Sequence, residues 1–270
     1  MWHNRLLMES NSNDLATEQY WDKNWKAEGL PRKIHPYKYP IQSRQANVFK
    51  QYLPRGGRFL EIGCGGSAWM PFFAETMNCE LWGVDYSKPG LELAHQNLKL
   101  LGQKAHLVLG DYIQVDLPLN SFRIIFSRGV IEHYADPSPL FCRSFELLEP
   151  GGFHVTIIPN MAGLPGWVTK KIDRKVYDVH VPFRPADLDR FQQAAGFESV
   201  VASRAFGVFY LGVINWKNTF DRMPPFLARS MAYLFQVIDF SLGWGSWPFD
   251  RILDSELTSP YYLSIYRKPK

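Results

Sequence analysis

The stretch RFLEIGCGGSAW, residues 58–69, joins a short apolar run to a cluster of small residues. A buried strand that gives way to Gly-x-Gly can turn sharply, because glycine has no Cβ, and the next helix begins with unpaired N–H groups. Gly63, Gly65 and Ala68 also fit the dinucleotide fingerprint, with Asp85 about twenty residues later. The stretch therefore predicts a cofactor cradle on a Rossmann-like sheet.

A carboxylate inside this stretch separates two classes of cofactor. Glu61 stands two residues before the first glycine, where it adds nothing to the binding of a pyrophosphate. S-adenosylmethionine carries an ammonium and a sulfonium group and no phosphate, so Glu61 suits its amino-acid end and Asp85 suits its ribose. We therefore expect S-adenosylmethionine as the cofactor. A local structural role for Glu61 stays open.

The chain alternates strand-like and helix-like segments from residue 58 onward. This alternation predicts an α/β fold: a doubly wound, mostly parallel, seven-stranded sheet with helices on both faces. The predicted strands are 58–62, 80–85, 105–111, 122–127, 152–159, 199–209 and 261–268. The predicted helices between them are 67–77, 87–102, 139–152 and 184–197.

Residues 215–258 break the alternation. They contain an apolar-rich run, 226–247, which predicts a helical insertion between the sixth and seventh strands, packed over the domain. Arg229 and Asp239 interrupt the run and argue against a membrane span, since each charge is costly in a bilayer. Contact of this insertion with a membrane surface is the less favoured alternative.

Composition narrows the classes of partner and compartment. The net charge is +4, but Lys and Arg are scattered, so we expect no nucleic-acid partner. Cys64, Cys79 and Cys142 are too widely spaced for a disulfide framework or a zinc motif, so we expect a cytoplasmic protein and no metal. The N-terminal segment lacks a signal-like apolar run and is expected to be a flexible lead-in. The sequence indicates no oligomeric state.

Five motifs in order resemble those of class I, seven-stranded S-adenosylmethionine-dependent methyltransferases, especially the small-molecule branch that includes ubiquinone-type enzymes. They are EIGCGGS (61–67), WGVDYS (82–87), VLGDY (108–112), SRGVIEHY (127–134) and LLEPGG (147–152). The resemblance covers about residues 46–204 and the last strand. Ser67 stands where the family usually has its third glycine, which leaves the packing at that position open.

The resemblance implies a role for each motif in binding the cofactor. It implies that Asp85 holds both ribose hydroxyls, and that the backbone near Ser127 and Arg128 faces the methionine part. Arg44 is expected, by analogy with related methyltransferases, to reach the cofactor carboxylate. The other expected cofactor-binding residues are Glu61, Gly63 and Gly65 in the turn, Tyr86 and Tyr112 beside the adenine, and Asp111 at its amino group.

The N-terminal segment EQYWDKNW (18–25) predicts a helix with Trp21 and Trp25 on one face. The resemblance implies a lid over the cofactor, where a ring of Trp21 could meet the sulfonium by a cation–π contact. Packing alone is the other explanation. We accordingly expect a lead-in and lid helix over residues 1–45 and a methyltransferase domain over residues 46–270.

The acceptor side is predicted from two histidines and the insertion. His133 follows the fourth strand and is the first candidate for a catalytic base, with Glu132 pointing elsewhere. His180 is the second candidate. The insertion, with Trp216, Trp244 and Trp247, favours an apolar or aromatic small molecule methylated on oxygen or nitrogen. An NAD-dependent oxidoreductase and a non-catalytic scaffold that keeps the fold are the alternatives.

Overall fold

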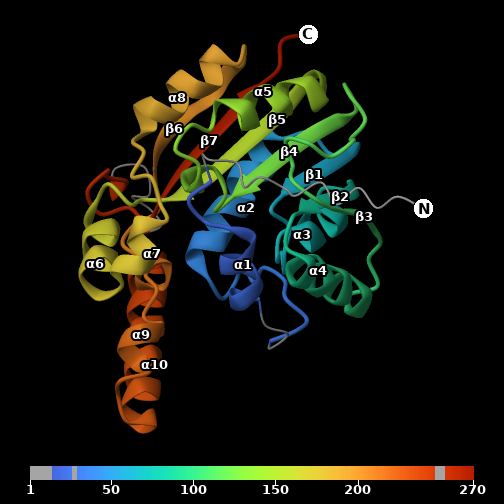
Figure 1. Ribbon diagram of the computed structural model, residues 1–270. Helices are drawn as coiled ribbons and strands as arrows, with labels where there is room; N and C mark the ends of the chain where they lie inside the picture. Colours follow the sequence, from blue (N-terminus) through green and yellow to red (C-terminus); the bar gives the residue numbers. More distant parts are fainter. Residues whose placement is uncertain (1–13, 26–28, 247–252) are drawn as a thin grey trace.

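The computed structural model describes residues 14–25, 29–246 and 253–270, which form an α/β fold around a seven-stranded sheet (Figure 1). The strand order is β3-β2-β1-β4-β5-β7-β6. The five strands from β3 to β5 run parallel to one another, and β7 runs antiparallel to both of its neighbours, β5 and β6. The strands are β1 (Arg58–Ile62), β2 (Glu80–Asp85), β3 (Ala105–Leu109), β4 (Phe122–Arg128), β5 (Leu148–Pro159), β6 (Glu198–Phe206) and β7 (Tyr261–Arg267). The predicted sheet is confirmed. Residues 1–13 of the expected flexible lead-in (1–20) and Trp247 lie outside the described residues.

Helices cover both faces of the sheet, as predicted (Figure 1). One face packs against α2 (Pro40–Tyr52), α3 (Met70–Glu75) and α4 (Lys88–Leu100), and the other against α5 (Ser138–Leu147) and α8 (Pro185–Ala194). Side chains alternate between these two cores along each strand, so Phe59 packs on α3 while Leu60 packs on α5. The rings of Phe59 and Phe73 stack with centroids 4.0 Å apart. Full burial of each such ring stabilises the fold by about 1.5–3 kcal/mol.

The helix α2 crosses the domain boundary that the sequence suggested after residue 45. It begins at Pro40, and its buried residues Ile41, Ala46 and Phe49 belong to the core under the sheet. The proposed boundary therefore divides a helix of the core. Within the predicted lead-in and lid region, the helix that contacts α4 rather than the core under the sheet is α1 (Glu18–Asn24).

The insertion forms helices, as predicted, but does not pack over the domain. It follows η2 (Leu211–Val213) and contains α9 (Lys217–Phe220) and α10 (Pro225–Gly245), and α10 projects away from the sheet (Figure 1). None of the α10 side chains is buried in the described structure. Its contacts include α2 and η2, where Asp239 accepts hydrogen bonds from the amides of Leu211 (2.7 Å) and Gly212 (3.1 Å). They also include α9, where the ring centroid of Phe235 lies 6.0 Å from that of Phe220.

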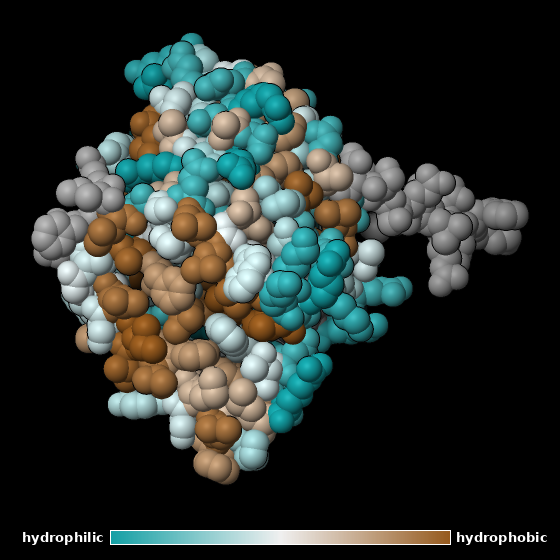
Figure 2. All heavy atoms as spheres, turned by 90° about the vertical axis from the view of Figure 1, so that its left-hand side faces the viewer, coloured by the Kyte–Doolittle hydropathy of each residue, from teal (hydrophilic) through white to brown (hydrophobic). Residues whose placement is uncertain are grey.

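The free surface of α10 carries large apolar side chains. Figure 2 views the molecule from this side and shows brown apolar side chains gathered on the lower part of the molecule. The exposed ones on α10 are Phe226, Leu227, Tyr233, Leu234, Val237, Phe240 and Leu242. Across the described residues, no helix combines the length and apolar character needed to cross a membrane. Along the chain, two further helices, α6 (Leu164–Ile172) and α7 (Arg174–Asp178), come between β5 and α8.

Candidate active site

A cavity of about 390 Å³ opens at the carboxyl ends of β1, β2 and β4. The strand order reverses direction between β1 and β4, and this is where open α/β sheets bind their ligands. The walls come from the ends of these strands, from the glycine turn after β1 and from the two tryptophans of the α1 segment. The volume lies within the range of about 300–1,000 Å³ that is usual for small-molecule sites.

The glycine turn after β1 uses its own amides to hold its shape. Gly63 adopts a left-handed φ of 66°, which favours glycine at this position. The amides of Gly63 and Cys64 donate to the carbonyl of Val84 (2.8 and 3.2 Å), and the amide of Gly65 donates to the Asp85 carboxylate (2.7 Å). These three amides are already used within the protein and are not available to a phosphate. The turn therefore offers little to a diphosphate.

Ser67 compensates for the missing third glycine. Its hydroxyl donates to the Glu61 carboxylate (2.6 Å) and accepts from the amides of Trp69 (3.0 Å) and Met70 (3.2 Å) at the start of α3. The Ser67 hydroxyl thus pairs two amides at the N-terminus of α3 and also holds the Glu61 carboxyl in place. Glu61 lines the cavity, and its burial raises the pKa of the carboxyl to about 8, although the Ser67 hydrogen bond opposes this shift.

Asp85, at the end of β2, is a second buried carboxylate in the cavity wall. One of its oxygens accepts from the amide of Ser87 (2.8 Å) and the other from Gly65. Burial raises the pKa of Asp85 to about 6, and these two hydrogen bonds oppose the shift. Each carboxylate oxygen can accept a further hydrogen bond, so Asp85 could receive two neighbouring hydroxyl groups of a ligand.

Aromatic residues close the cavity from the α1 side. Trp21 stacks on Trp25, with ring centroids 6.0 Å apart and planes at 24°, as the helical spacing predicted. A Cβ on Gly65 would lie 2.6 Å from the Trp25 ring, so this glycine is what lets the indole approach the turn. Tyr86 ties the segment down by donating to the carbonyl of Ala16 (2.6 Å). Trp21, Trp25 and Tyr86 all line the cavity.

Two of the expected cofactor-binding side chains, those of Arg44 and Asp111, do not line the cavity. Arg44 forms a buried ion pair with Asp254 (3.0 Å) and its guanidinium lies 4.9 Å from the centroid of the Phe206 ring, so the expected contact with a cofactor carboxylate is wrong. Asp111 accepts from the amide of Ile113 (3.0 Å), and the cavity wall is made by its neighbour Gly110. The expectation for Ser127 concerned the backbone at this strand end. The Ser127 side chain is fully buried in β4, whereas Arg128 lines the cavity because side chains alternate along a strand.

Tyr112 lines the cavity as expected, and its hydroxyl lies 2.8 Å from that of Ser144. Sequence reasoning did not select Tyr134, or the side chains of Arg128 and Gln42, all of which line the cavity. Arg128 and Tyr134 belong to the motif SRGVIEHY, so the sequence did indicate that this segment lies at the site. Nothing in the sequence around Gln42 marks it, because α2 meets the cavity only through the packing of the fold.

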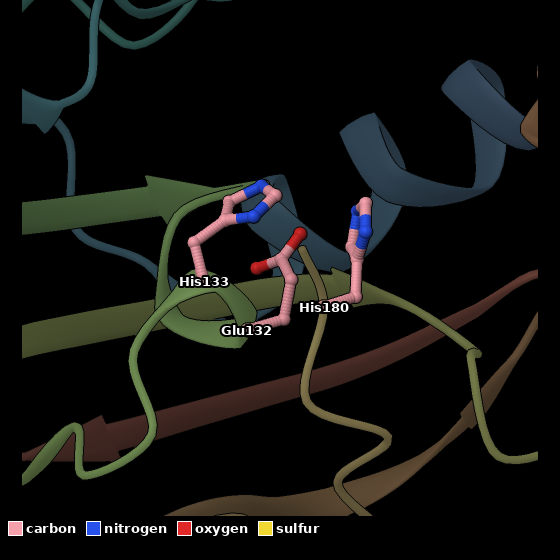
Figure 3. A group of neighbouring side chains, drawn as sticks. All are labelled: Glu132, His133 and His180. Atoms are coloured by element: carbon pink, nitrogen blue, oxygen red, sulfur yellow. The ribbon is translucent and has the colours of Figure 1, made fainter. Parts of the chain in front are cut away.

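The two candidate histidines lie together. His133, in the turn η1 (Ile131–His133), is 4% exposed, and its Nδ1 donates to the carbonyl of Val179 (2.6 Å). Its ring centroid lies 4.4 Å from that of His180, and burial lowers the pKa of His133 to about 3. Glu132 was expected to point elsewhere, but Figure 3 shows it between the two rings, and one ligand atom of each residue lies within 4.8 Å of the others.

Comparisons with known proteins agree with this geometry. A family model described as a methyltransferase domain matches residues 60–156. Phosphoethanolamine N-methyltransferase 3 of Arabidopsis thaliana is 28% identical over 207 residues, which are 72% of this chain and 41% of that protein. The chain therefore spans less than half the length of this relative. The ubiquinone biosynthesis O-methyltransferase of Pseudomonas fluorescens (strain SBW25) is 23% identical over 193 residues, which are 68% of this chain and 79% of that protein.

A solved structure has the same fold. Phosphoethanolamine N-methyltransferase 2 of Haemonchus contortus, in complex with S-adenosyl-L-methionine, superposes with a TM-score of 0.60. It is 20% identical and the superposition covers 95% of this chain and 59% of that one. At this identity the likeness concerns the fold, and the residues of the cavity carry the argument for what it binds.

Proposed function

We propose that this chain, whose class I methyltransferase fold contains a methyltransferase domain over residues 60–156, transfers a methyl group from S-adenosylmethionine to an oxygen or nitrogen atom of a small molecule. The observation that carries the proposal is the pair of buried carboxyl groups, Glu61 and Asp85, in a cavity where the turn amides of residues 63–65 are already hydrogen bonded. Such a cavity suits a cationic nucleoside better than a diphosphate.

The residues of the cavity fit the parts of this cofactor. Glu61 would accept from the ammonium group, Asp85 from the ribose hydroxyls, and the turn at Gly63 and Gly65 would support both. Tyr86 and Tyr112 would pack beside the adenine. When bound, the cofactor supplies an electrophilic methyl group on a sulfonium.

Two further side chains would complete the cofactor site. Arg128 is the exposed cation in the cavity wall, and it takes the role of binding the cofactor carboxylate that sequence reasoning assigned to Arg44. Trp21 presents an aromatic ring to the same space and would lie near the sulfonium.

His133 is the residue that we assign to the acceptor. Because a carbonyl can only accept, the bond to Val179 places the proton on Nδ1 and leaves the Nε2 lone pair for an acceptor O–H or N–H. With a pKa near 3 the imidazole stays neutral at physiological pH. Its role would be to orient the acceptor and to accept a hydrogen bond from the acceptor's proton, which becomes more acidic as the methyl group is transferred.

A second cavity supports an apolar acceptor. It measures about 460 Å³, lies between the start of α2 and the insertion, and is lined by aromatic side chains that include Trp216, Phe220 and Phe235. Gln42 lines both this cavity and the cofactor cavity. The insertion over residues 215–258 would thus receive the apolar part of the acceptor beside the cofactor. The relatives named for phosphoethanolamine and ubiquinone biosynthesis act on small molecules of different polarity, so the acceptor's class rests on this cavity.

Calorimetry with S-adenosylhomocysteine and with NAD tests the cofactor, and release of S-adenosylhomocysteine across a panel of metabolites tests the activity. We expect binding of S-adenosylhomocysteine and turnover with an apolar or aromatic hydroxyl or amine. Binding of NAD alone would indicate the oxidoreductase, and failure to turn over any acceptor would favour a scaffold. We also propose a cytoplasmic location, which the three free cysteines support.

A further inference from the structure

Three polar side chains from two distant segments meet beside the cofactor cavity (Figure 3). Glu132 and His133 belong to η1, and His180 belongs to the loop that follows α7. Two hydrogen bonds hold this loop against η1: the amide of Val181 donates to the carbonyl of Glu132 (2.7 Å), and His133 donates to Val179. The arrangement of the three side chains is therefore built by the tertiary fold.

Both histidines present an unprotonated nitrogen. The Nδ1 atoms of His133 and His180 each lie 2.6 Å from a backbone carbonyl oxygen, of Val179 and Val176 respectively. A carbonyl only accepts, so each Nδ1 carries the proton and each Nε2 keeps its lone pair. Histidines that ligate metal ions are oriented by this same hydrogen bond from the other ring nitrogen.

Glu132 supplies a buried carboxyl group to the cluster, and because burial raises its pKa to about 8, a bound cation must displace its proton. The residue is 1% exposed, and its Oε2 atom has no hydrogen-bond partner in the part of the chain that the structure describes. A buried carboxylate without a partner is costly, and a cation placed against it removes that cost. The cluster therefore combines two neutral imidazole donors with one unsatisfied carboxylate.

We propose that Glu132, His133 and His180 bind a divalent transition-metal ion of the zinc class. Two imidazoles and a carboxylate form the ligand set of open catalytic zinc sites and of non-haem iron sites. One ring nitrogen of each histidine and one oxygen of Glu132 lie within 4.8 Å of one another. A tetrahedral ion with bonds of about 2.1 Å needs them about 3.4 Å apart, so the loop and η1 must close by about an ångström.

The position of the cluster gives the ion an entry path and an open coordination site. His180 is only half-buried, which provides access from solvent, and His133 lines the cofactor cavity, so that a free coordination position would face the acceptor side. The ion would occupy the Nε2 lone pair that the proposed acceptor role uses. In the metal-bound form, the open position of the ion would therefore meet the acceptor in place of the Nε2 atom.

The test uses the metal alone, without cofactor or acceptor, so its result is independent of the proposed methyl transfer. The full chain is stripped with a chelator and titrated with Zn²⁺ by calorimetry, and Co²⁺ is added in its place to look for visible d–d absorption. We expect a single ion per chain. Affinity should fall at least about 100-fold in Glu132→Gln and in His180→Gln, since loss of a ligand should cost no less than loss of an outer-shell partner.

The matched control is His106→Gln, which removes an exposed histidine whose Nε2 lies 3.6 Å from the Glu80 carboxylate. This variant should bind Zn²⁺ as the parent does. Circular dichroism and the thermal unfolding midpoint of each variant report whether it is folded, and His180→Gln remains informative if the buried Glu132→Gln does not fold. Absence of Zn²⁺ binding by the parent, equal binding by His180→Gln, or loss of binding in His106→Gln would overturn the proposal.

Discussion

The buried carboxyl of Glu61 makes cofactor binding dependent on pH. Burial raises its pKa to about 8 in the free protein, so below that pH most molecules carry it protonated. A ligand ammonium prefers the ionised form, and binding must therefore release a proton. By linkage, affinity rises with pH as long as the carboxyl of Glu61 is mostly protonated and the ligand amino group stays charged.

The magnitude follows from the fraction of ionised carboxyl. With a pKa of about 8, that fraction rises roughly 20-fold between pH 6.0 and pH 7.5, so the dissociation constant of S-adenosylhomocysteine should fall by roughly that factor. Titration calorimetry in buffers of different ionisation enthalpy measures both the constant and the proton released. The variant Glu61→Gln keeps a carbonyl oxygen for the Ser67 hydroxyl but has nothing to ionise.

We expect Glu61→Gln to lose most of this pH dependence and to bind about 10- to 150-fold more weakly at pH 7.5, the cost of a hydrogen bond to a charged group. The control Glu80→Gln changes an exposed carboxylate of β2 outside the cavity lining and should behave as the parent does. An affinity that stays constant from pH 6.0 to 7.5 in the parent would refute the assignment of Glu61 to the ammonium group.

Further substitutions test the other parts of the site. Gly65→Ala places a Cβ within 2.8 Å of the Asp85 carboxylate and should abolish S-adenosylhomocysteine binding in calorimetry, whereas Gly245→Ala meets no atom within 4 Å and should not. His133→Ala should lower turnover at least about 100-fold with cofactor affinity nearly unchanged, as expected when a group acts on the proton of the acceptor; equal turnover would remove that role. Arg44→Ala leaves a buried carboxylate unpaired and should lower the free energy of unfolding by about 3–5 kcal/mol in denaturant titrations, without a specific loss of cofactor affinity in the folded protein.

The sequence by itself was enough for the sheet and for the cofactor end of the site. Strand and helix periodicity depend on neighbouring residues, so each of the seven predicted strands overlaps an observed one. The glycine turn and Asp85 are also local features, because a motif at the end of a parallel strand must lie at the carboxyl edge of the sheet. Glu61 and Asp85 line the cavity for this reason.

Only the tertiary structure decided which distant residues meet. Arg44 pairs with Asp254, 210 residues later, and no spacing rule links two such positions. His180 reaches Glu132 because the loop after α7 folds back onto η1, a contact between segments far apart in the chain. The apolar run of α10 predicted a helix correctly but not its direction, since hydrophobicity shows that a surface can be buried and does not identify what would cover it. Local chemistry therefore determined the elements, and long-range packing determined their partners.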